Sequence, residues 1–149
     1  MKILVSACLM GQNCKYNGGN NYSETLLSLT KGHELIPICP ETAGGLPTPR
    51  TPCEIVEGEV RTRDGESRDR AFREGARLCL EIAKEQKIDL AILQSRSPSC
   101  GVDQIYDGSF SGKLIPGSGV FAALLQQNGF RVLDVSELTE AALERMEEG

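Results

Sequence analysis

Short hydrophobic runs alternate with polar, glycine-rich segments along this chain. Three runs, KILVSAC (2–8), ELIPIC (34–39) and DLAILQSRSPSC (89–100), begin with stretches of apolar residues that are too short for buried helices. Such runs are typical of strands buried in a parallel sheet. A fourth short run, RVLDV (131–135), predicts a last strand.

Four segments between and after these runs predict helices. They lie at about 23–30, from about 67 onward, at 118–127, and from Ser136 onward, where Glu137 and Glu140 suit the positive end of a helix. Ser23 is a candidate N-cap for the first of them. The second carries an apolar stripe at helical spacing, which we expect to face the core: Phe72, Ala76, Cys79 and Ala83.

Proline, glycine and alternating segments predict the connections. PETAGGLPTPRTPCE (40–54) predicts a rigid irregular loop without helix. EIVEGEVRT (54–62) predicts a strand or hairpin, and IYDGSFSGKLI (105–115) predicts a small hairpin. The order of elements predicts an α/β fold: one compact three-layer domain over residues 1–149, with a mostly parallel, Rossmann-like sheet and a small hairpin excursion.

Composition narrows the compartment and the partners. The 149-residue chain has a net charge of −5 with scattered Lys and Arg, so we expect neither a nucleic-acid backbone nor an anionic membrane as partner. The N-terminal apolar stretch is too short for a signal peptide or a membrane span, which favours a cytoplasmic location. In that reducing compartment the six cysteines are metal ligands, catalytic thiols or core residues rather than a disulfide framework.

Three of the cysteines share one kind of position. Cys8, Cys39 and Cys100 each stand at or just past the end of a predicted strand. The carboxyl ends of parallel strands meet at the edge where α/β proteins bind ligands, so the three thiols could converge on one crevice. Soft thiolates suit iron–sulfur clusters, zinc or cuprous copper, and a 4Fe-4S cluster held by three cysteines leaves one iron open. Buried cysteines can equally be small hydrophobic residues, and the spacing does not decide between these two interpretations.

Polar residues near these strand ends are candidates for acid–base chemistry and ligand binding. Glu41 follows Cys39 in a loop stiffened by proline. Ser97 and Ser99 flank a proline in the SPSC turn and could hold a polar ligand or cap the turn. Arg50 and Arg96 offer planar donors for a carbonyl or anion of the substrate, with an ion pair to Glu54 or another acid as the alternative.

Other motifs are weaker candidates for a catalytic or binding site. His33 is the only histidine and precedes its strand, so we read it as a solvated turn residue rather than part of a triad. DGSFSGK (107–113) lacks the first glycine and the final Ser or Thr of a phosphate-binding loop. GSGVFA (117–122) fits a dinucleotide fingerprint at a helix start, with Asp134 ending the next strand, but no full strand precedes it.

Longer blocks resemble a known family. VSACLMGQNCKYNGGNN, CPETAGGLPTPRTPCEI and RSPSCG followed by IYDGSFSGKLIPGSGV are similar to the signature blocks of the thiouracil desulfurase (TudS) family. The resemblance implies a 4Fe-4S enzyme that removes sulfur from a thiolated pyrimidine without net redox change. It assigns the cluster to Cys8, Cys39 and Cys100, proton transfer or water activation to Glu41, and the hold on substrate or departing sulfide to Ser97. Aerobic preparation can leave such a site with another metal or none.

The sequence leaves open the roles of the other cysteines and the identity of the substrate. Cys14, in the first glycine-rich loop, is the main rival ligand to Cys8 or Cys39. Cys53 and Cys79 end no predicted strand and read as packing residues. Gln94 and Asn17 depart from the Lys and Asp expected from the family blocks, which bears on the identity of the substrate.

Three functions therefore compete. The leading one is cluster-dependent cleavage of a carbon–sulfur bond in a thio-base or related small thiolated compound. The second is non-catalytic binding of zinc or a cluster for storage or redox sensing. The third is a nucleotide-binding module centred on Gly117 and Gly119.

Overall fold

A four-stranded parallel sheet forms the centre of the computed structural model, which describes residues 1–148. Its order is β2 (Glu34–Ile38), β1 (Lys2–Ser6), β5 (Leu90–Leu93) and β8 (Val132–Asp134). Every neighbouring pair is parallel. The α/β class and the mostly parallel, Rossmann-like sheet predicted from the sequence are thus confirmed.

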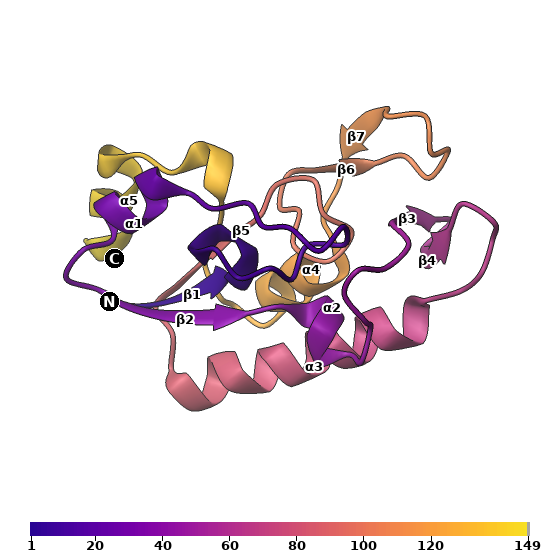
Figure 1. The fold of residues 1–149 in the computed structure, drawn as a ribbon. Coiled ribbons are helices and arrows are strands. Elements are labelled where there is room, and N and C mark those ends of the chain that lie inside the picture. Colours follow the sequence, from indigo (N-terminus) through magenta and orange to yellow (C-terminus); the bar gives the residue numbers. More distant parts are fainter. Residues whose placement is uncertain (149) are drawn as a thin grey trace.

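Helices cover both faces of this sheet (Figure 1). The long helix α3 (Asp69–Gln86) packs with α4 (Val120–Gln127) on one face. The short helix α1 (Glu24–Leu29) and the C-terminal helix α5 (Glu140–Glu147) lie on the other. Because all four strands are parallel, their carboxyl ends lie together at one edge of the sheet.

The side chains of β1 show how the sequence produces this layering. Leu4 is buried in the core shared with α3 and α4, whereas Ile3 and Val5 are buried in the core on the α1 and α5 side. Alternate strand residues point to opposite faces, so a strand covered on both sides is apolar throughout. The predicted helical stripe is confirmed, because all four of its members are buried in α3: Phe72, Ala76, Cys79 and Ala83.

Two hairpins stand apart from the sheet, beyond the carboxyl ends of its strands (Figure 1). The first pairs β3 (Cys53–Val56) with β4 (Glu59–Thr62), and the second pairs β6 (Gln104–Tyr106) with β7 (Leu114–Pro116). The first turns at 57–58, where both residues have positive φ, the conformation that tight two-residue hairpins require. Both predicted hairpins are confirmed.

Two elements near the strand ends differ from expectation. Strand β1 stops at Ser6, and Cys8 lies in a 3-10 turn (Ala7–Met10). The segment expected to lack helix contains α2 (Pro40–Ala43), with Cys39 as its N-cap. Proline is tolerated at the first position of a helix because its missing N–H has no intrahelical acceptor there.

The last helix also begins later than expected. Thr139 caps α5 by accepting from the Ala142 N–H at 3.0 Å. Ser136, the predicted start, lies in a 3-10 turn, where its N–H donates to Asp134 at 2.9 Å. The Asp134 side chain thus turns the chain before the helix can begin.

Glycine permits α2 to dock directly on α3. A Cβ at Gly75 would stand 1.7 Å from the Pro40 carbonyl oxygen, and a Cβ at Gly44 would stand 2.0 Å from the Ala71 carbonyl oxygen. The two backbones therefore touch without side chains between them. This contact fixes α2, and with it Glu41, at the edge of the sheet.

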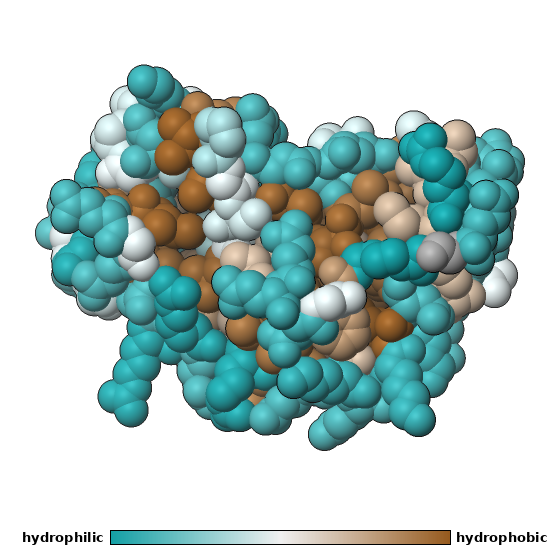
Figure 2. Space-filling view, turned by 180° about the vertical axis from the view of Figure 1, so that it is seen from behind, coloured by the Kyte–Doolittle hydropathy of each residue, from teal (hydrophilic) through white to brown (hydrophobic). Residues whose placement is uncertain are grey.

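The surface is mainly hydrophilic. Figure 2 shows hydrophilic side chains projecting around and across the hydrophobic residues of the rear face. Among the described residues, the large hydrophobic side chains that are clearly exposed are Tyr16 and Tyr22. Within residues 1–148, every helix is too short or too polar to cross a membrane.

Candidate functional site

A cavity of about 510 Å³ opens at the carboxyl ends of the sheet strands. Its floor comes from the segments after β1, β2 and β5, and its outer wall comes from the two hairpins. In the strand order β2-β1-β5-β8 the chain leaves β1 toward β2 and leaves β5 toward β8, on opposite sides, so β1 and β5 flank the point where the winding direction reverses. Ligands in open α/β sheets bind at this switch point.

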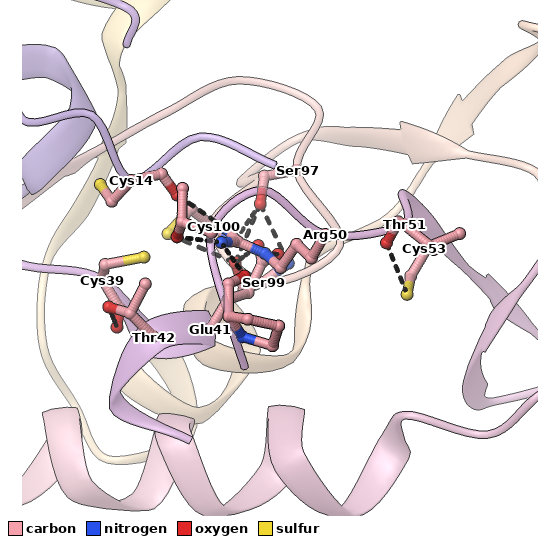
Figure 3. Close-up of polar contacts among 12 residues, drawn as sticks. Cys14, Cys39, Glu41, Thr42, Arg50, Thr51, Cys53, Ser97, Ser99 and Cys100 are labelled. Atoms are coloured by element: carbon pink, nitrogen blue, oxygen red, sulfur yellow. Dashed lines mark hydrogen bonds and ion pairs between the residues drawn. The ribbon is translucent and has the colours of Figure 1, made fainter. Parts of the chain in front are cut away.

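Five thiols line this cavity, and four of them belong to the segments after β1, β2 and β5: Cys8, Cys14, Cys39 and Cys100. The structure thus brings together the three cysteines singled out by strand-end position and adds their rival. Figure 3 shows Cys14, Cys39 and Cys100 on one side of the site, with Cys53 well away beside Thr51.

The Cys14 thiol lies next to two of the other thiols and lowers the pKa of both. Its hydrogen bond lowers the pKa of Cys8 to about 7 and the pKa of Cys39 to about 6, in both cases against the effect of burial. Its interactions with Cys39 and Cys8 raise the pKa of Cys14 itself well above its usual range, which keeps its one proton in place. The arrangement favours thiolates at Cys8 and Cys39, which is the form that binds metals.

The remaining cluster candidate is held differently. Burial raises the pKa of Cys100, whose side chain lies under its own loop, with the Ser99 hydroxyl 3.7 Å from its Sγ. Asn21 donates through Nδ2 to the Sγ of Cys8 at 3.4 Å. Sequence reasoning missed Asn21, since one amide in a segment rich in Asn and Gly carries no distinctive signal.

The donor set fits a cluster better than a single ion. Among residues 1–148, no three histidine, cysteine or acidic side chains converge closely enough to share one metal ion. A cubane of four irons takes its thiolates at separate corners, so its ligands are spread around a cavity rather than gathered at a point. Thiols on separate strand-end segments around one cavity meet that requirement.

Glu41 lies beside the thiols and is held at both oxygens. Its Oε1 accepts from Arg50 Nε at 3.0 Å, and its Oε2 accepts from the Ser99 hydroxyl at 2.8 Å. The Glu41 side chain is 15% exposed and the Arg50 side chain 7%. Helix α2 brings the carboxylate here because Glu41 lies in its first turn, two residues after Cys39.

The two arginines proposed to bind substrate have different surroundings. Arg50 donates through Nη1 to the Pro47 carbonyl and the Thr48 hydroxyl, and through Nη2 to the Cys14 carbonyl at 2.8 Å. With Nε on Glu41, most of its donors are used within the protein, which favours a positioning role over a substrate contact. Arg96 lines the cavity, is exposed, and has a φ of 62°.

Ser97 presents its hydroxyl to the cavity from a tight turn. Its Oγ accepts from the backbone N–H groups of Ser99 at 3.1 Å and Cys100 at 3.0 Å. It also lies 2.9 Å from the Ser99 hydroxyl. Figure 3 shows Ser97, Ser99, Glu41 and Arg50 joined by these contacts in one chain.

The glycine motif before α4 supports this turn instead of a nucleotide. The first N–H groups of the helix, from Val120 and Phe121, donate to the carbonyls of Pro98 and Ser99 at 2.8 and 2.9 Å. A Cβ at Gly119 would stand 2.6 Å from the Ser99 carbonyl, so glycine is required for this approach. The nucleotide interpretation is therefore wrong, because the donors that would hold a phosphate are already bonded to the SPSC turn.

Several residues of the outer wall were not found from the sequence. Tyr106, Phe110 and Arg63 line the cavity from the hairpins, and Arg63 stacks over the Phe110 ring. Residues on hairpins have no shared motif or spacing that would have revealed them. Cys53, read as a packing residue, does pack against the core but also lines the cavity, and burial raises its pKa to about 11.

His33 is not a free turn residue. Its Nδ1 lies 2.8 Å from the Met1 amino group, and its Nε2 lies 2.9 Å from the Glu147 carboxylate. It therefore joins the start of the chain to α5, at the end of the sheet opposite the cavity.

The fold and the site define a doubly wound α/β protein with a thiol-rich pocket and an adjoining carboxylate–hydroxyl chain at its switch point. The family model described as 2-thiouracil desulfurase matches residues 3–137. The chain belongs to this family, which confirms the resemblance seen in the signature blocks. A solved structure, the [4Fe-4S]-dependent thiouracil desulfidase TudS, superimposes with a TM-score of 0.88 at 41% identity and covers 97% of each chain. A Bacillus subtilis (strain 168) relative, called uncharacterized protein YbbK, is 44% identical over 148 residues, or 93% of this chain and 98% of the relative.

Proposed function

We propose that this protein is a 4Fe-4S-dependent enzyme that cleaves the carbon–sulfur bond of a thiouracil or a closely related small thiolated compound. The observation that carries the proposal is the presence, in one cavity, of cysteine thiols from separate strand ends and the Glu41–Ser99–Ser97 chain. Family membership and the likeness to a [4Fe-4S]-dependent desulfidase support the same activity.

The proposed cluster ligands are Cys8, Cys39 and Cys100, which follow three adjacent strands of the sheet. The low pKa values of Cys8 and Cys39 favour the thiolate forms that a cluster requires. Cys14 then remains protonated and donates its one proton to either Cys8 or Cys39, rather than serving as a ligand. When bound, the cluster supplies a Lewis-acidic iron that is not held by protein and suits a sulfur donor on the substrate.

The protein side chains supply the proton chemistry. The reaction replaces the exocyclic sulfur with oxygen from water, so that a thiocarbonyl and water give a carbonyl and hydrogen sulfide, without oxidation or reduction. Ser97 faces the cavity and holds the attacking water or the departing sulfide. Glu41 takes the proton that the water must lose and returns one to the sulfide, as a general base and then acid.

A reducing, cytoplasmic setting suits this site. All six cysteines are free thiols in the structure, and oxidation of any proposed ligand would prevent cluster binding. We place the protein there on the chemistry of its thiols.

Anaerobic reconstitution tests the proposal. We expect about four iron and four acid-labile sulfide per chain, together with release of sulfide from 2- or 4-thiouracil. Changing Cys8, Cys39 or Cys100 to serine should abolish both iron binding and turnover, whereas Cys79→Ser, in the core, should keep both. Cys14→Ser should keep iron, and loss of iron in that variant would show that Cys14 is a ligand. A fully loaded protein that releases no sulfide from any thiolated base would rule out the proposed activity.

A further inference from the structure

We propose that Ser99 is a proton relay between Ser97 and Glu41, rather than a contact for substrate. This inference rests on the proposed function and specifies how its acid–base group reaches the reacting atoms. The Ser99 hydroxyl donates to Glu41 Oε2 at 2.8 Å and lies 2.9 Å from the Ser97 hydroxyl.

The direction of the hydrogen bonds follows from the number of protons. Ser99 has a single hydroxyl proton, and a carboxylate can only accept, so that proton lies on the bond to Glu41. The bond between the two hydroxyls must then use the Ser97 proton, with Ser99 accepting. The chain therefore runs in one direction, from Ser97 through Ser99 to Glu41.

Both oxygens of Glu41 are already engaged by donors from the protein. Oε1 accepts from Arg50 at 3.0 Å and Oε2 accepts from Ser99, and these contacts hold the carboxylate plane in one orientation. Ser99 is 2% exposed, whereas Ser97 is partly exposed, so Ser97 is the more accessible end of the pair. The connected route from the carboxylate to a reacting water thus passes through both serines.

The Ser97 end of the chain is built to lose a proton. Two backbone N–H groups, from Ser99 and Cys100, point at its Oγ from 3.1 and 3.0 Å. Such donors stabilise negative charge that develops on an oxygen, as in an oxyanion hole. A Ser97 oxygen that is passing its proton to Ser99 is therefore stabilised until it takes another from the water.

The proton transfers balance over one turnover. As the water oxygen bonds to the thiocarbonyl carbon, its proton goes to Ser97, the Ser97 proton goes to Ser99, and the Ser99 proton goes to Glu41. As the carbon–sulfur bond breaks, the same chain runs in reverse and delivers one proton to the leaving sulfur. The second hydroxyl proton of the added water moves to the sulfide through solvent, which leaves the oxo base and hydrogen sulfide.

Ser99 acts through Ser97 and Glu41 and does not contact the substrate. Its test therefore measures kcat and the affinity for the product separately. In protein matched for iron content, Ser99→Ala should lower kcat on the order of 10²-fold. The dissociation constant of the oxo product, measured by calorimetry, should not change. Ser99→Thr, which keeps a hydroxyl, should restore most of the rate. Ser28→Ala, at an exposed position on α1, is the matched control and should leave both quantities unchanged.

A double variant tests whether the residues act as one unit. Glu41→Gln combined with Ser99→Ala should be no slower than Glu41→Gln alone, since groups in one chain are not additive. If the loss of kcat in the double variant equals the product of the two single losses, the relay is wrong. Weakened product binding with unchanged kcat in Ser99→Ala would also overturn it, as would a rate loss that only follows lost iron. Absence of turnover in loaded wild-type protein would instead remove the proposed function, and the relay with it.

Discussion

Arg50 and Glu41 form a partly buried ion pair, with Nε donating to Oε1 at 3.0 Å. The same guanidinium also donates to the Cys14 carbonyl at 2.8 Å. One side chain therefore ties the proposed acid–base group to the loop that carries a thiol next to the cluster ligands. Through Arg50, the proposed site of proton transfer is in direct contact with the loop beside the proposed sulfur-binding cluster.

Arg50→Lys should impair turnover without removing iron. A lysine keeps the charge but lacks the planar fork that meets several acceptors at once. Because Glu41 would then be held less firmly, we expect kcat to fall on the order of 10²-fold. Steady-state kinetics with parallel iron analysis measures this, and Arg77→Lys, exposed on α3, is the control. Wild-type kcat in Arg50→Lys would contradict the positioning role.

Two glycines of the same motif should respond differently to alanine. A Cβ at Gly119 would lie 2.6 Å from the backbone of Ser99, whereas a Cβ at Gly117 would lie 3.1 Å from the flexible end of Ile105. Gly119→Ala should therefore displace the SPSC turn and lower kcat strongly, while Gly117→Ala should have a small effect. Kinetic constants of the two loaded variants check the difference. Equal effects would show that the close approach of α4 to the turn is not required.

Alanine at Gly75 should destabilise the protein, although alanine is the better helix former by about 1 kcal/mol. The added Cβ would overlap the Pro40 carbonyl oxygen at 1.7 Å and push α2 away from α3. We expect the free energy of unfolding to fall by about 1–3 kcal/mol, as for other overpacked contacts. Urea unfolding of the cluster-free protein measures this, with Glu85→Ala at an exposed position on α3 as reference. Stabilisation by Gly75→Ala would contradict the backbone contact.

Thiols of the cluster-free protein should differ in reactivity with pH. The hydrogen bond from Cys14 lowers the pKa of Cys39 to about 6, while burial raises the pKa of Cys53 to about 11. The thiolate fraction rises as pH passes the pKa, so at neutral pH Cys39 is mostly ionised and Cys53 is protonated. Iodoacetamide at pH 7 should therefore label Cys39 first, as peptide mass spectrometry can show. Labelling of Cys53 before Cys39 would refute the assigned order of acidity.

The two hairpins should loosen when Glu54 is shortened. Its Oε1 accepts from the N–H groups of Gly108 and Phe110 at 2.9 and 3.1 Å, which joins the two hairpins to each other in the outer wall. Glu54→Ala should raise KM and leave kcat close to the wild-type value, because the wall rather than the proton chain is affected. Glu54→Gln retains an oxygen acceptor and should preserve KM. Steady-state kinetics of both variants distinguishes a wall residue from a catalytic one.

Hydrophobic pattern and chain position were enough to predict the sheet, the hairpins and the meeting of the strand-end cysteines. The interpretation of 40–54 was wrong in one respect, because proline favours the first turn of a helix as well as an irregular loop, and α2 uses it in that way. A local pattern cannot show which of these two applies. The contact that decides it, between α2 and Gly75 of α3, joins segments far apart in the sequence.

The polar chain of the site was less accessible to sequence reasoning. Glu41, Ser97, Ser99 and Arg50 could each be singled out, but not their connection, since hydrogen-bond direction depends on three-dimensional placement. GSGVFA satisfies a nucleotide fingerprint in spacing alone. Its helix N–H groups are bonded to Pro98 and Ser99, and this occupancy is visible only in the fold.

The separation of the hairpins from the parallel sheet has an evolutionary consequence. The proposed cluster ligands and the Ser97–Ser99–Glu41 chain are anchored to the strand ends, α2 and α4, whereas Tyr106, Phe110 and Arg63 stand on or beside hairpins that are separate from the parallel sheet. Mutations in those hairpins reshape the outer wall without moving a proposed cluster ligand. Selection can therefore change which thiolated compound is accepted while the sulfur-removing machinery is inherited intact.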